Sequence, residues 1–262
     1  MRDLVVDLRG VTVRYGSLVA LADLDLCVRA GEVVALLGPS GAGKTTLLRC
    51  MNRLVVPTAG TGTVLGVSLD ADEREWRLAR RRIGFIFQDY GLVDRLSVFR
   101  NVTAGRLGDG GLAAAIGMPS RATRRAALAA LERVGLAGRA TAAARDLSGG
   151  QRQRVAIARV LAQQPSLVLA DEPVSSLDPA MAATVLDLLR TTADELGSTC
   201  VATFHDVGMA RRFADRVVAV RDGRVVFDGA AIDFGEDAHR DVYGICANTE
   251  RPAAVAARVS VA

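Results

Sequence analysis

The chain has 262 residues, with 33 basic and 29 acidic side chains, and 50% of its residues are hydrophobic. This composition excludes a disordered, collagen-like or low-complexity protein, and the length predicts one large domain or a core with a sizeable insertion. Apolar runs such as residues 33–37 are far shorter than the roughly 18 residues of a membrane helix, and no apolar signal segment follows Met1. We therefore expect a protein that stays in the cytosol.

The cysteines indicate no special site, whereas the distribution of basic residues singles out one position. The cysteines at positions 27, 50, 200 and 246 show no C-x-x-C spacing, so we expect core residues and neither a zinc site nor disulfides. The charge excess is too small to indicate a nucleic-acid partner. All basic residues are arginine except Lys44. An arginine-rich genome explains this bias, but it does not explain the position at which the one lysine is kept.

The first third of the chain predicts strands. Residues 4–9, 11–14 and 23–28 alternate apolar and polar positions, as half-buried antiparallel strands do. Residues 33–37 form a continuous apolar run, which predicts a strand buried on both faces. We therefore expect a small antiparallel sheet beside a more deeply buried one.

The buried strand leads into a glycine-rich loop. Residues 38–46 fit the pattern G-x-x-x-x-G-K-[ST], and the apolar spacing of residues 47–54 predicts a helix behind them. In this context successive backbone N–H groups point at one anion, and the helix N-terminus adds its positive end. Lys44 would contact the β- and γ-phosphates of a nucleotide, and Thr45 would ligate Mg²⁺. The candidate phosphate-binding residues are Gly38, Pro39, Ser40, Gly41, Ala42, Gly43, Lys44, Thr45 and Thr46.

The middle of the chain changes from strand to helix. A predicted strand at 83–87 ends at Gln88, and the residues from 89 to about 164 are rich in alanine and arginine. Within this segment, residues 123–134 have helical apolar spacing and end before Gly135.

A second helix start has unusual chemistry. Ser148 and Gln151 have the S-x-x-Q spacing of a capping box, at the start of a predicted helix that runs to about Gln164. It could be an ordinary capped helix. However, Gly149 and Gly150 leave backbone N–H groups bare, which favours a second anion site. We call the glycine-rich loop at 38–46 and this helix start at 148–151 the two phosphate cradles. The phosphates of a single nucleotide cannot easily contact both cradles of one molecule.

Two adjacent acids follow another buried strand. Residues 166–170 predict the strand, and Asp171 and Glu172 come directly after it. Because strand side chains alternate in direction, Asp171 can face a metal ion while Glu172 faces a water in line with the γ-phosphate. Beside the glycine-rich loop, these acids make nucleoside triphosphate hydrolysis the leading reaction.

The last third adds a histidine and a hairpin. Residues 199–204 are strand-like and precede His205, one of only two histidines. The apolar residues 217–220 and 225–227 flank Asp222-Gly223, which predicts a hairpin.

From about residue 4 to residue 245 the chain resembles the ATP-binding subunits of ABC transporters, whose L-S-G-G-Q signature stands here at residues 147–151. The resemblance implies an α/β fold: a P-loop ATPase core with a mostly parallel sheet, an N-terminal antiparallel β subdomain and an inserted α-helical subdomain at about 89–164. We therefore expect one domain over residues 1–248, and the small residues that follow it predict a flexible tail at 249–262. The resemblance also implies ATP sandwiched in a head-to-tail homodimer, which accounts for the two cradles.

The resemblance assigns roles to single residues. Tyr15 would stack on adenine, and residues 175–178 would form a loop that crosses the dimer interface. The implied contacts to the partner's ATP are Ser148, Gly149, Gly150 and Gln151. The implied catalytic residues are Glu172 as the base, His205 at the γ-phosphate, and Gln88, which senses Mg²⁺ and the attacking water; the implied Mg²⁺ ligands are Thr45, Gln88 and Asp171.

Subfamilies differ in the stretch after Gln88. Residues 92–98 read LVDRLSV, followed by NV at 101–102 and AGRLG at 104–108, and this is similar to the ATP-binding subunit of phosphonate importers. The similarity implies an ATPase at the cytoplasmic face of the cell membrane that powers uptake of phosphonates or related phosphorus oxyanions. Its partners would be transmembrane permease subunits and, indirectly, a solute-binding protein.

Three alternatives stay open. Residues 204–206 read Phe-His-Asp where many phosphonate importers have Leu-His-Gln, so the cargo could be another small solute, of the polar amino acid or methionine type. A non-transport ABC ATPase would need two cassettes in one chain or long heptads, and this sequence has neither. A P-loop kinase or GTPase would lack the signature at 147–151.

Overall fold

The computed structural model describes residues 3–109, 118–175 and 177–244. The tail expected at 249–262, Ser176 of the expected interface loop and Cys246 lie outside these residues. The strands are β1 (Leu4–Tyr15), β2 (Leu18–Arg29), β3 (Val33–Leu37), β4 (Ala59–Val64), β5 (Val67–Ser68), β6 (Ile83–Ile86), β7 (Leu167–Ala170), β8 (Thr199–Thr203), β9 (Arg216–Arg221) and β10 (Arg224–Ala230). The α-helices are α1 (Lys44–Met51), α2 (Glu73–Arg80), α3 (Val98–Thr103), α5 (Arg121–Arg133), α6 (Gly149–Gln163), α7 (Pro179–Leu196), α8 (Val207–Phe213) and α9 (Glu236–Tyr243). Short 3₁₀ helices are η1 (Ala104–Asp109), η2 (Ala137–Arg139), η3 (Ala144–Asp146) and η4 (Ala231–Asp233).

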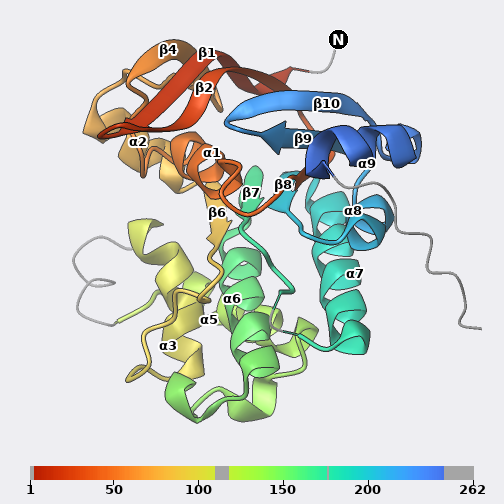
Figure 1. The fold of residues 1–262 in the computed structure, drawn as a ribbon. Coiled ribbons are helices and arrows are strands. Elements are labelled where there is room, and N and C mark those ends of the chain that lie inside the picture. Colours follow the sequence, from red (N-terminus) through yellow and green to blue (C-terminus); the bar gives the residue numbers. More distant parts are fainter. Residues whose placement is uncertain (1–2, 110–117, 176, 245–262) are drawn as a thin grey trace, which may run out of the picture.

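The strands form two sheets (Figure 1). An antiparallel sheet has the order β2-β1-β4-β5, and a second sheet has the order β10-β9-β3-β8-β7-β6. In the second sheet all neighbours from β9 to β6 are parallel, and β10 pairs antiparallel with β9 through the predicted hairpin. The expected α/β class, with a mostly parallel sheet and an N-terminal antiparallel sheet, is confirmed.

The central sheet is buried on both faces. Val33, Ala35 and Leu37 pack into one hydrophobic cluster with residues of α3, α5, α6 and α7. Val34 and Leu36 pack into a second cluster with residues of β1, β2, α1 and α2. Because consecutive side chains of a strand point to opposite faces, a strand buried on both faces needs an unbroken apolar run. The expectation for residues 33–37 is therefore confirmed.

The first strand differs from the prediction. β1 is one strand from Leu4 to Tyr15, although its alternation breaks at Gly10. The register against β2 shifts between Leu8 and Val11, as at a bulge. The Gly10 N–H donates to Asp25 Oδ1 at 2.7 Å instead of continuing the ladder. The break in alternation therefore marks a bulge inside a strand and not the end of one.

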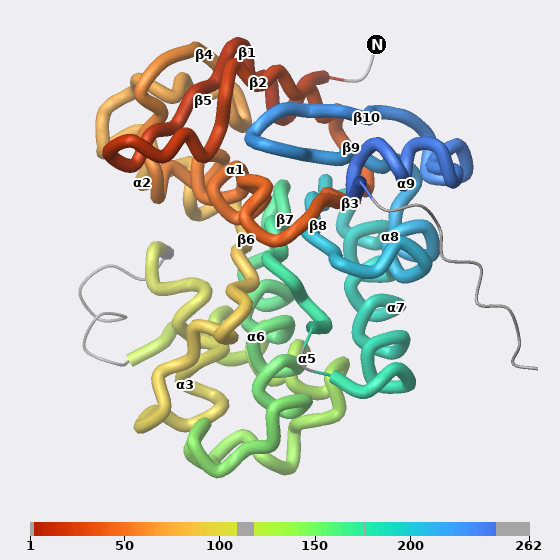
Figure 2. Tube along the Cα trace, viewed as in Figure 1, coloured from red at the N-terminus to blue at the C-terminus, as the bar shows by residue number. Residues whose placement is uncertain are grey.

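The helices α3, α5 and α6 pack against one another. Figure 2 shows this group on the side of the molecule opposite β1 and β2. α5 begins two residues earlier than predicted, because the Ser120 hydroxyl caps it by accepting from the Thr123 N–H. α6 begins with the predicted capping box of Ser148 and Gln151. Within the described ranges, no helix combines the length and the apolar composition needed to cross a membrane.

Trp76 provides a test of the packing between the antiparallel sheet and the rest of the chain. Its side chain on α2 is fully buried, and its Nε1 donates to the Ser68 carbonyl at 2.9 Å. We predict that Trp76→Ala lowers the free energy of unfolding by about 3–5 kcal/mol, because it creates a cavity. Leu78→Ala on the same helix, where the leucine is 54% exposed, should change stability by less than about 1 kcal/mol. Urea unfolding measures both, and equal effects would contradict the packing described.

Candidate functional site

The glycine-rich loop begins at the carboxyl end of β3, between β8 and β9. Its first residue, Gly38, has a φ of +147°, and a Cβ there would lie 2.1 Å from the Val220 carbonyl oxygen. A side chain would therefore push the loop off the sheet. The loop ends at Gly43, where α1 begins without a side-chain cap. The first N–H groups of α1 are thus available to an anion.

Lys44 turns its ammonium group back into the loop. Its Nζ donates to the carbonyl oxygens of Gly38 at 2.6 Å and Pro39 at 3.0 Å, and only 6% of the residue is exposed. Burial lowers the pKa of Lys44, and the nearby carboxylates of Glu172 and Asp171 partly offset this effect. The loop thus encloses one compact positive charge.

Asp171 links the loop to the neighbouring strands. Its Oδ1 accepts hydrogen bonds from Thr45 Oγ1 at 3.0 Å and from Thr203 Oγ1 at 3.1 Å. The Thr203 hydroxyl also accepts from the Glu172 N–H at 2.7 Å. Thr203, at the end of β8, therefore positions both acids.

The three implied catalytic side chains meet at Glu172. Gln88 Nε2 donates to Glu172 Oε2 at 3.1 Å, and His205 Nε2 contacts Glu172 Oε1. These residues follow β6, β7 and β8, which are neighbours in the sheet. Glu172 has a φ of +47°, a conformation that non-glycine residues seldom adopt and that clusters at functional sites. The carboxylate is thus held from both sides, as a residue that accepts a proton from a defined direction needs to be.

A hollow of about 460 Å³ joins these parts. It is lined by residues 40–46 of the loop, by Gln88, Glu172 and His205, and by Tyr15 at the end of β1. Tyr15 is 48% exposed, so its ring is available for stacking. Of the other predicted residues, Gly38, Pro39 and Asp171 do not line the hollow, but they accept hydrogen bonds from Lys44 and Thr45, which do.

The second predicted cradle lies elsewhere. Ser148, Gly149, Gly150 and Gln151 are not among the described residues that line the hollow. The Ser148 hydroxyl accepts from the Gln151 N–H, and Gln151 Oε1 accepts from the Ser148 N–H. This capping box satisfies neither the Gly149 N–H nor the Gly150 N–H. The chain therefore carries a helix start open to an anion at a distance from its own phosphate loop.

Sequence reasoning missed two parts of the site. Thr203 is one of many threonines, and its role depends on the pairing of β8 with β7. Leu18, Val19 and Ala20 also line the hollow, because β2 returns beside Tyr15. The signal for Thr203 was its position as the last residue of a buried strand, two residues before His205.

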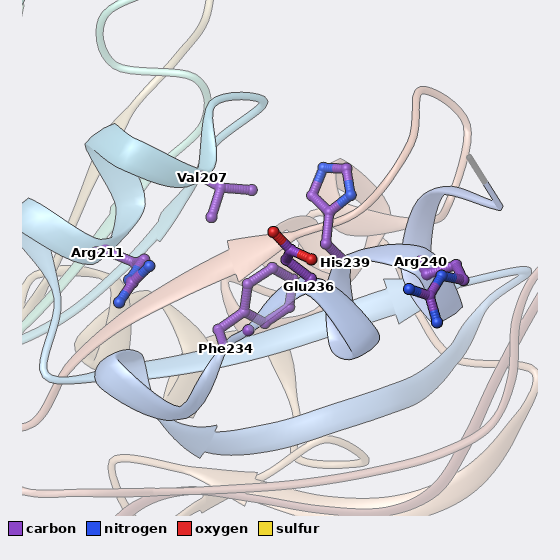
Figure 3. Close-up of a pocket in the computed structure, with 7 residues that line it drawn as sticks. Val207, Arg211, Phe234, Glu236, His239 and Arg240 are labelled. Atoms are coloured by element: carbon purple, nitrogen blue, oxygen red, sulfur yellow. The ribbon is translucent and has the colours of Figure 1, made fainter. Parts of the chain in front are cut away.

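A second hollow of about 370 Å³ lies between α8 and α9 (Figure 3). Val207 and Phe234 give it apolar surface, and Arg211, Glu236 and His239 give it charged or polar edges. In Figure 3 the Glu236 carboxylate points into the middle of this group. None of the predicted site residues lines it, so the hollow beside Lys44 is the candidate site.

The side-chain oxygen atoms near Lys44 are suitable ligands for a magnesium ion. Among the described residues, no group of three or more His, Cys, Asp and Glu side chains could hold a metal ion alone. Thr45, Asp171 and Gln88 offer hydroxyl, carboxylate and amide oxygens, which are the ligands that Mg²⁺ prefers. The Thr45 and Asp171 oxygens lie 3.0 Å apart. Such a small set suits an ion that takes most of its ligands from phosphate and water.

Comparison with known proteins gives the family. A family model described as ABC transporter matches residues 21–175. A phosphonates import ATP-binding protein from Cupriavidus metallidurans is 45% identical over 95% of this chain and 90% of its own length. A hypophosphite import ATP-binding protein from Stutzerimonas stutzeri is 42% identical over 97% of this chain and 76% of its own length.

Solved structures agree with the fold. A dimeric ATP-binding cassette in a post-hydrolysis state, bound to ADP and phosphate, has a TM-score of 0.77 and 34% identity over 86% of this chain and 98% of its own. A subunit of an ABC transporter complex from Clostridium perfringens has a TM-score of 0.76 and 29% identity over 92% of this chain and 93% of its own. This chain therefore belongs to the ABC transporter family, as one of its ATP-binding and ATP-hydrolysing subunits.

Proposed function

We propose that this chain is the ATP-hydrolysing subunit of an importer of phosphonates or related phosphorus oxyanions. The observation that carries the hydrolytic part is the meeting of Gln88 and His205 on the Glu172 carboxylate, beside the loop that encloses Lys44. The cargo class is supported by the relatives named for phosphonates and hypophosphite, together with residues 92–108.

The loop and Tyr15 bind ATP. The N–H groups of the loop and the Lys44 ammonium hold the phosphates, because both point at one small region of negative charge. Tyr15 lines the same hollow as the loop and Glu172, and its exposed ring stacks on adenine. The nucleotide is thus fixed at both ends.

Glu172 acts as the general base. As the water oxygen bonds to the γ-phosphorus and the bond to the β–γ bridging oxygen breaks, a Glu172 oxygen accepts the water proton. Gln88 and His205 hold the two carboxylate oxygens and thereby orient them. Thr45, Asp171 and Gln88 would hold Mg²⁺, which when bound neutralises charge on the β- and γ-phosphates.

Two copies of the chain work together, head to tail. Gly149 and Gly150 offer N–H groups that the capping box leaves free, and they are absent from the described lining of the chain's own hollow. The Ser148–Gln151 turn of each copy therefore completes the ATP site of the other. The similar cassette bound to ADP and phosphate is described as dimeric, which supports this arrangement.

The chain works as one domain beside the membrane. Residues 1–248 form one domain, in which the helices of residues 89–164 are an inserted subdomain that contacts a transmembrane permease. The complex sits at the cytoplasmic face of the cell membrane, and a solute-binding protein delivers the cargo to the permease. The packing of α3, α5 and α6 against one another supports the subdomain.

Glu172→Gln tests the base. We predict that the variant binds ATP normally but that its rate of hydrolysis falls by about 10²-fold or more, because the amide cannot accept the proton. Because ATP then stays bound, this variant should elute as a dimer in size-exclusion chromatography when ATP is present. Glu236→Gln, at an exposed residue of the second hollow, is the control and should hydrolyse ATP at the parental rate. Hydrolysis by Glu172→Gln at the parental rate would reject the role.

Substitutions of Lys44 test the phosphate cradle. Lys44→Ala should raise the Kd for labelled ATP about tenfold or more, because it removes a charge-assisted hydrogen bond. Lys44→Arg should bind almost as poorly, since the space between the Gly38 and Pro39 carbonyls accepts an ammonium group but not a planar guanidinium. If the arginine variant bound ATP as the parent does, charge alone would account for binding and the shape of the cradle would not.

Reconstitution tests the cargo. The complete complex with its permease is placed in liposomes, and the solute-binding protein is added loaded with methylphosphonate, phosphite, glutamate or methionine. The proposal expects the phosphorus oxyanions to stimulate ATP hydrolysis and the amino acids to have no effect. Stimulation by glutamate or methionine alone would overturn the cargo class and leave the hydrolytic mechanism intact.

A further inference from the structure

Arg159 has contacts that the ATPase mechanism does not use. It lies on α6, and its guanidinium donates to the carbonyl oxygens of Gly91 at 2.5 Å, Tyr90 at 3.1 Å and Phe85 at 3.5 Å. Phe85 belongs to β6, whereas the other two residues belong to the loop that follows Gln88. One side chain of α6 therefore holds the strand and the loop on both sides of Gln88.

The loop that Arg159 holds has a constrained backbone. Tyr90 has a φ of +67° and Gly91 a φ of +57°, and the left-handed conformation is unfavourable for a residue as large as tyrosine. Such a conformation persists only where surrounding contacts impose it. The two shortest Arg159 bonds end on the carbonyls of these two residues. The bonds therefore help to hold the turn through which the loop leaves Gln88, together with the hydrogen bond from the Tyr90 N–H to the Phe87 carbonyl at 2.9 Å.

The same loop reaches the start of α6. A Cβ on Gly149 would lie 3.3 Å from the Tyr90 hydroxyl oxygen. Tyr90 is thus held at its carbonyl by Arg159, while its side chain ends beside the first residue of the signature helix. The Tyr90 side chain thus meets α6 next to Ser148, and a third contact lies further along the loop, where Asp94 Oδ1 accepts from Arg152 Nη2 of α6 at 2.8 Å.

We propose that Arg159 is a positioning residue that fixes the Gln88 loop to α6, so that the loop and the Ser148–Gly150 turn move as one unit. This inference rests on the proposed head-to-tail dimer. In that dimer Gln88 belongs to the chain's own ATP site, and the turn belongs to the partner's site. Arg159 therefore couples the two ATP sites: a nucleotide that moves Gln88 also moves the turn that completes the other site.

The geometry explains why this residue is an arginine. Its planar fork presents several donors in fixed directions, and here they reach three carbonyl oxygens that lie on two different segments. The ammonium of a lysine is one compact group and cannot span the strand and the loop at once. Burial lowers the pKa of Arg159, and the nearby carboxylate of Asp89 partly offsets this effect.

Arg154 provides a matched control on the same helix. Its guanidinium donates to the Val134 carbonyl at 3.0 Å, and it therefore ties α6 to the end of α5 within the helical group. Arg154→Met and Arg159→Met each remove an arginine that links α6 to a backbone carbonyl. Of the two, only Arg159→Met removes hydrogen bonds to the Gln88 loop, and the Arg152–Asp94 pair is kept in both variants.

The experiment measures cooperativity of ATP hydrolysis and the affinity for ATP with the full chain. We expect Arg159→Met to bind labelled ATP with a Kd within about twofold of the parent, while its Hill coefficient for ATP falls from about 2 to about 1. Arg154→Met should keep the parental Hill coefficient. Arg159→Lys should behave like Arg159→Met and serves in its place if the methionine variant does not fold.

The controls separate this inference from the proposed function. If the parental chain shows no cooperativity and Glu172→Gln forms no ATP-dependent dimer, the proposed dimer fails and the coupling fails with it. If the parent is cooperative and Arg159→Met and Arg159→Lys are equally cooperative, the coupling role of Arg159 alone is overturned. Equal loss of cooperativity in Arg154→Met would also overturn it, because general loosening of α6 would then be the cause.

Discussion

The site depends on one shared atom, the Asp171 Oδ1 oxygen that accepts from both Thr45 and Thr203. These residues come from α1, from the turn after β7 and from the end of β8. Their hydrogen bonds form because β3, β8 and β7 are consecutive neighbours in the parallel sheet, so that their carboxyl ends meet at one edge. A shift of one residue in either strand pairing would turn Thr203 to the other face. Strand register is therefore the constraint on which the geometry of hydrolysis rests.

Two different kinds of order produce the two cradles. The loop around Lys44 is shaped by the sheet, since Gly38 packs against the Val220 carbonyl. The turn at Ser148 is shaped locally, by a capping box between residues three apart. The first cradle therefore depends on the pairing of the central strands, whereas the second depends on the start of α6. In the proposed dimer, each ATP site would combine one part of each kind.

Much of the fold could be predicted because its signals are local. The unbroken apolar run at 33–37 indicates burial on both faces, and the capping box at Ser148 is visible in four residues. What could not be predicted depends on tertiary pairing. The break at Gly10 indicated the end of a strand, but pairing with β2 carries the strand through a bulge. Thr203 and Arg159 carry no motif of their own, because their contacts lie with residues 32 and 68 to 74 positions away.

The hydrogen bonds of Lys44 within its own loop affect how it can bind a nucleotide. Its ammonium already has two oxygen partners, Gly38 at 2.6 Å and Pro39 at 3.0 Å. An ammonium group has three N–H donors, so these two bonds leave one donor for a phosphate oxygen. The loop thus aims the side chain before a phosphate reaches it, and little of its rotational freedom is left to lose on binding.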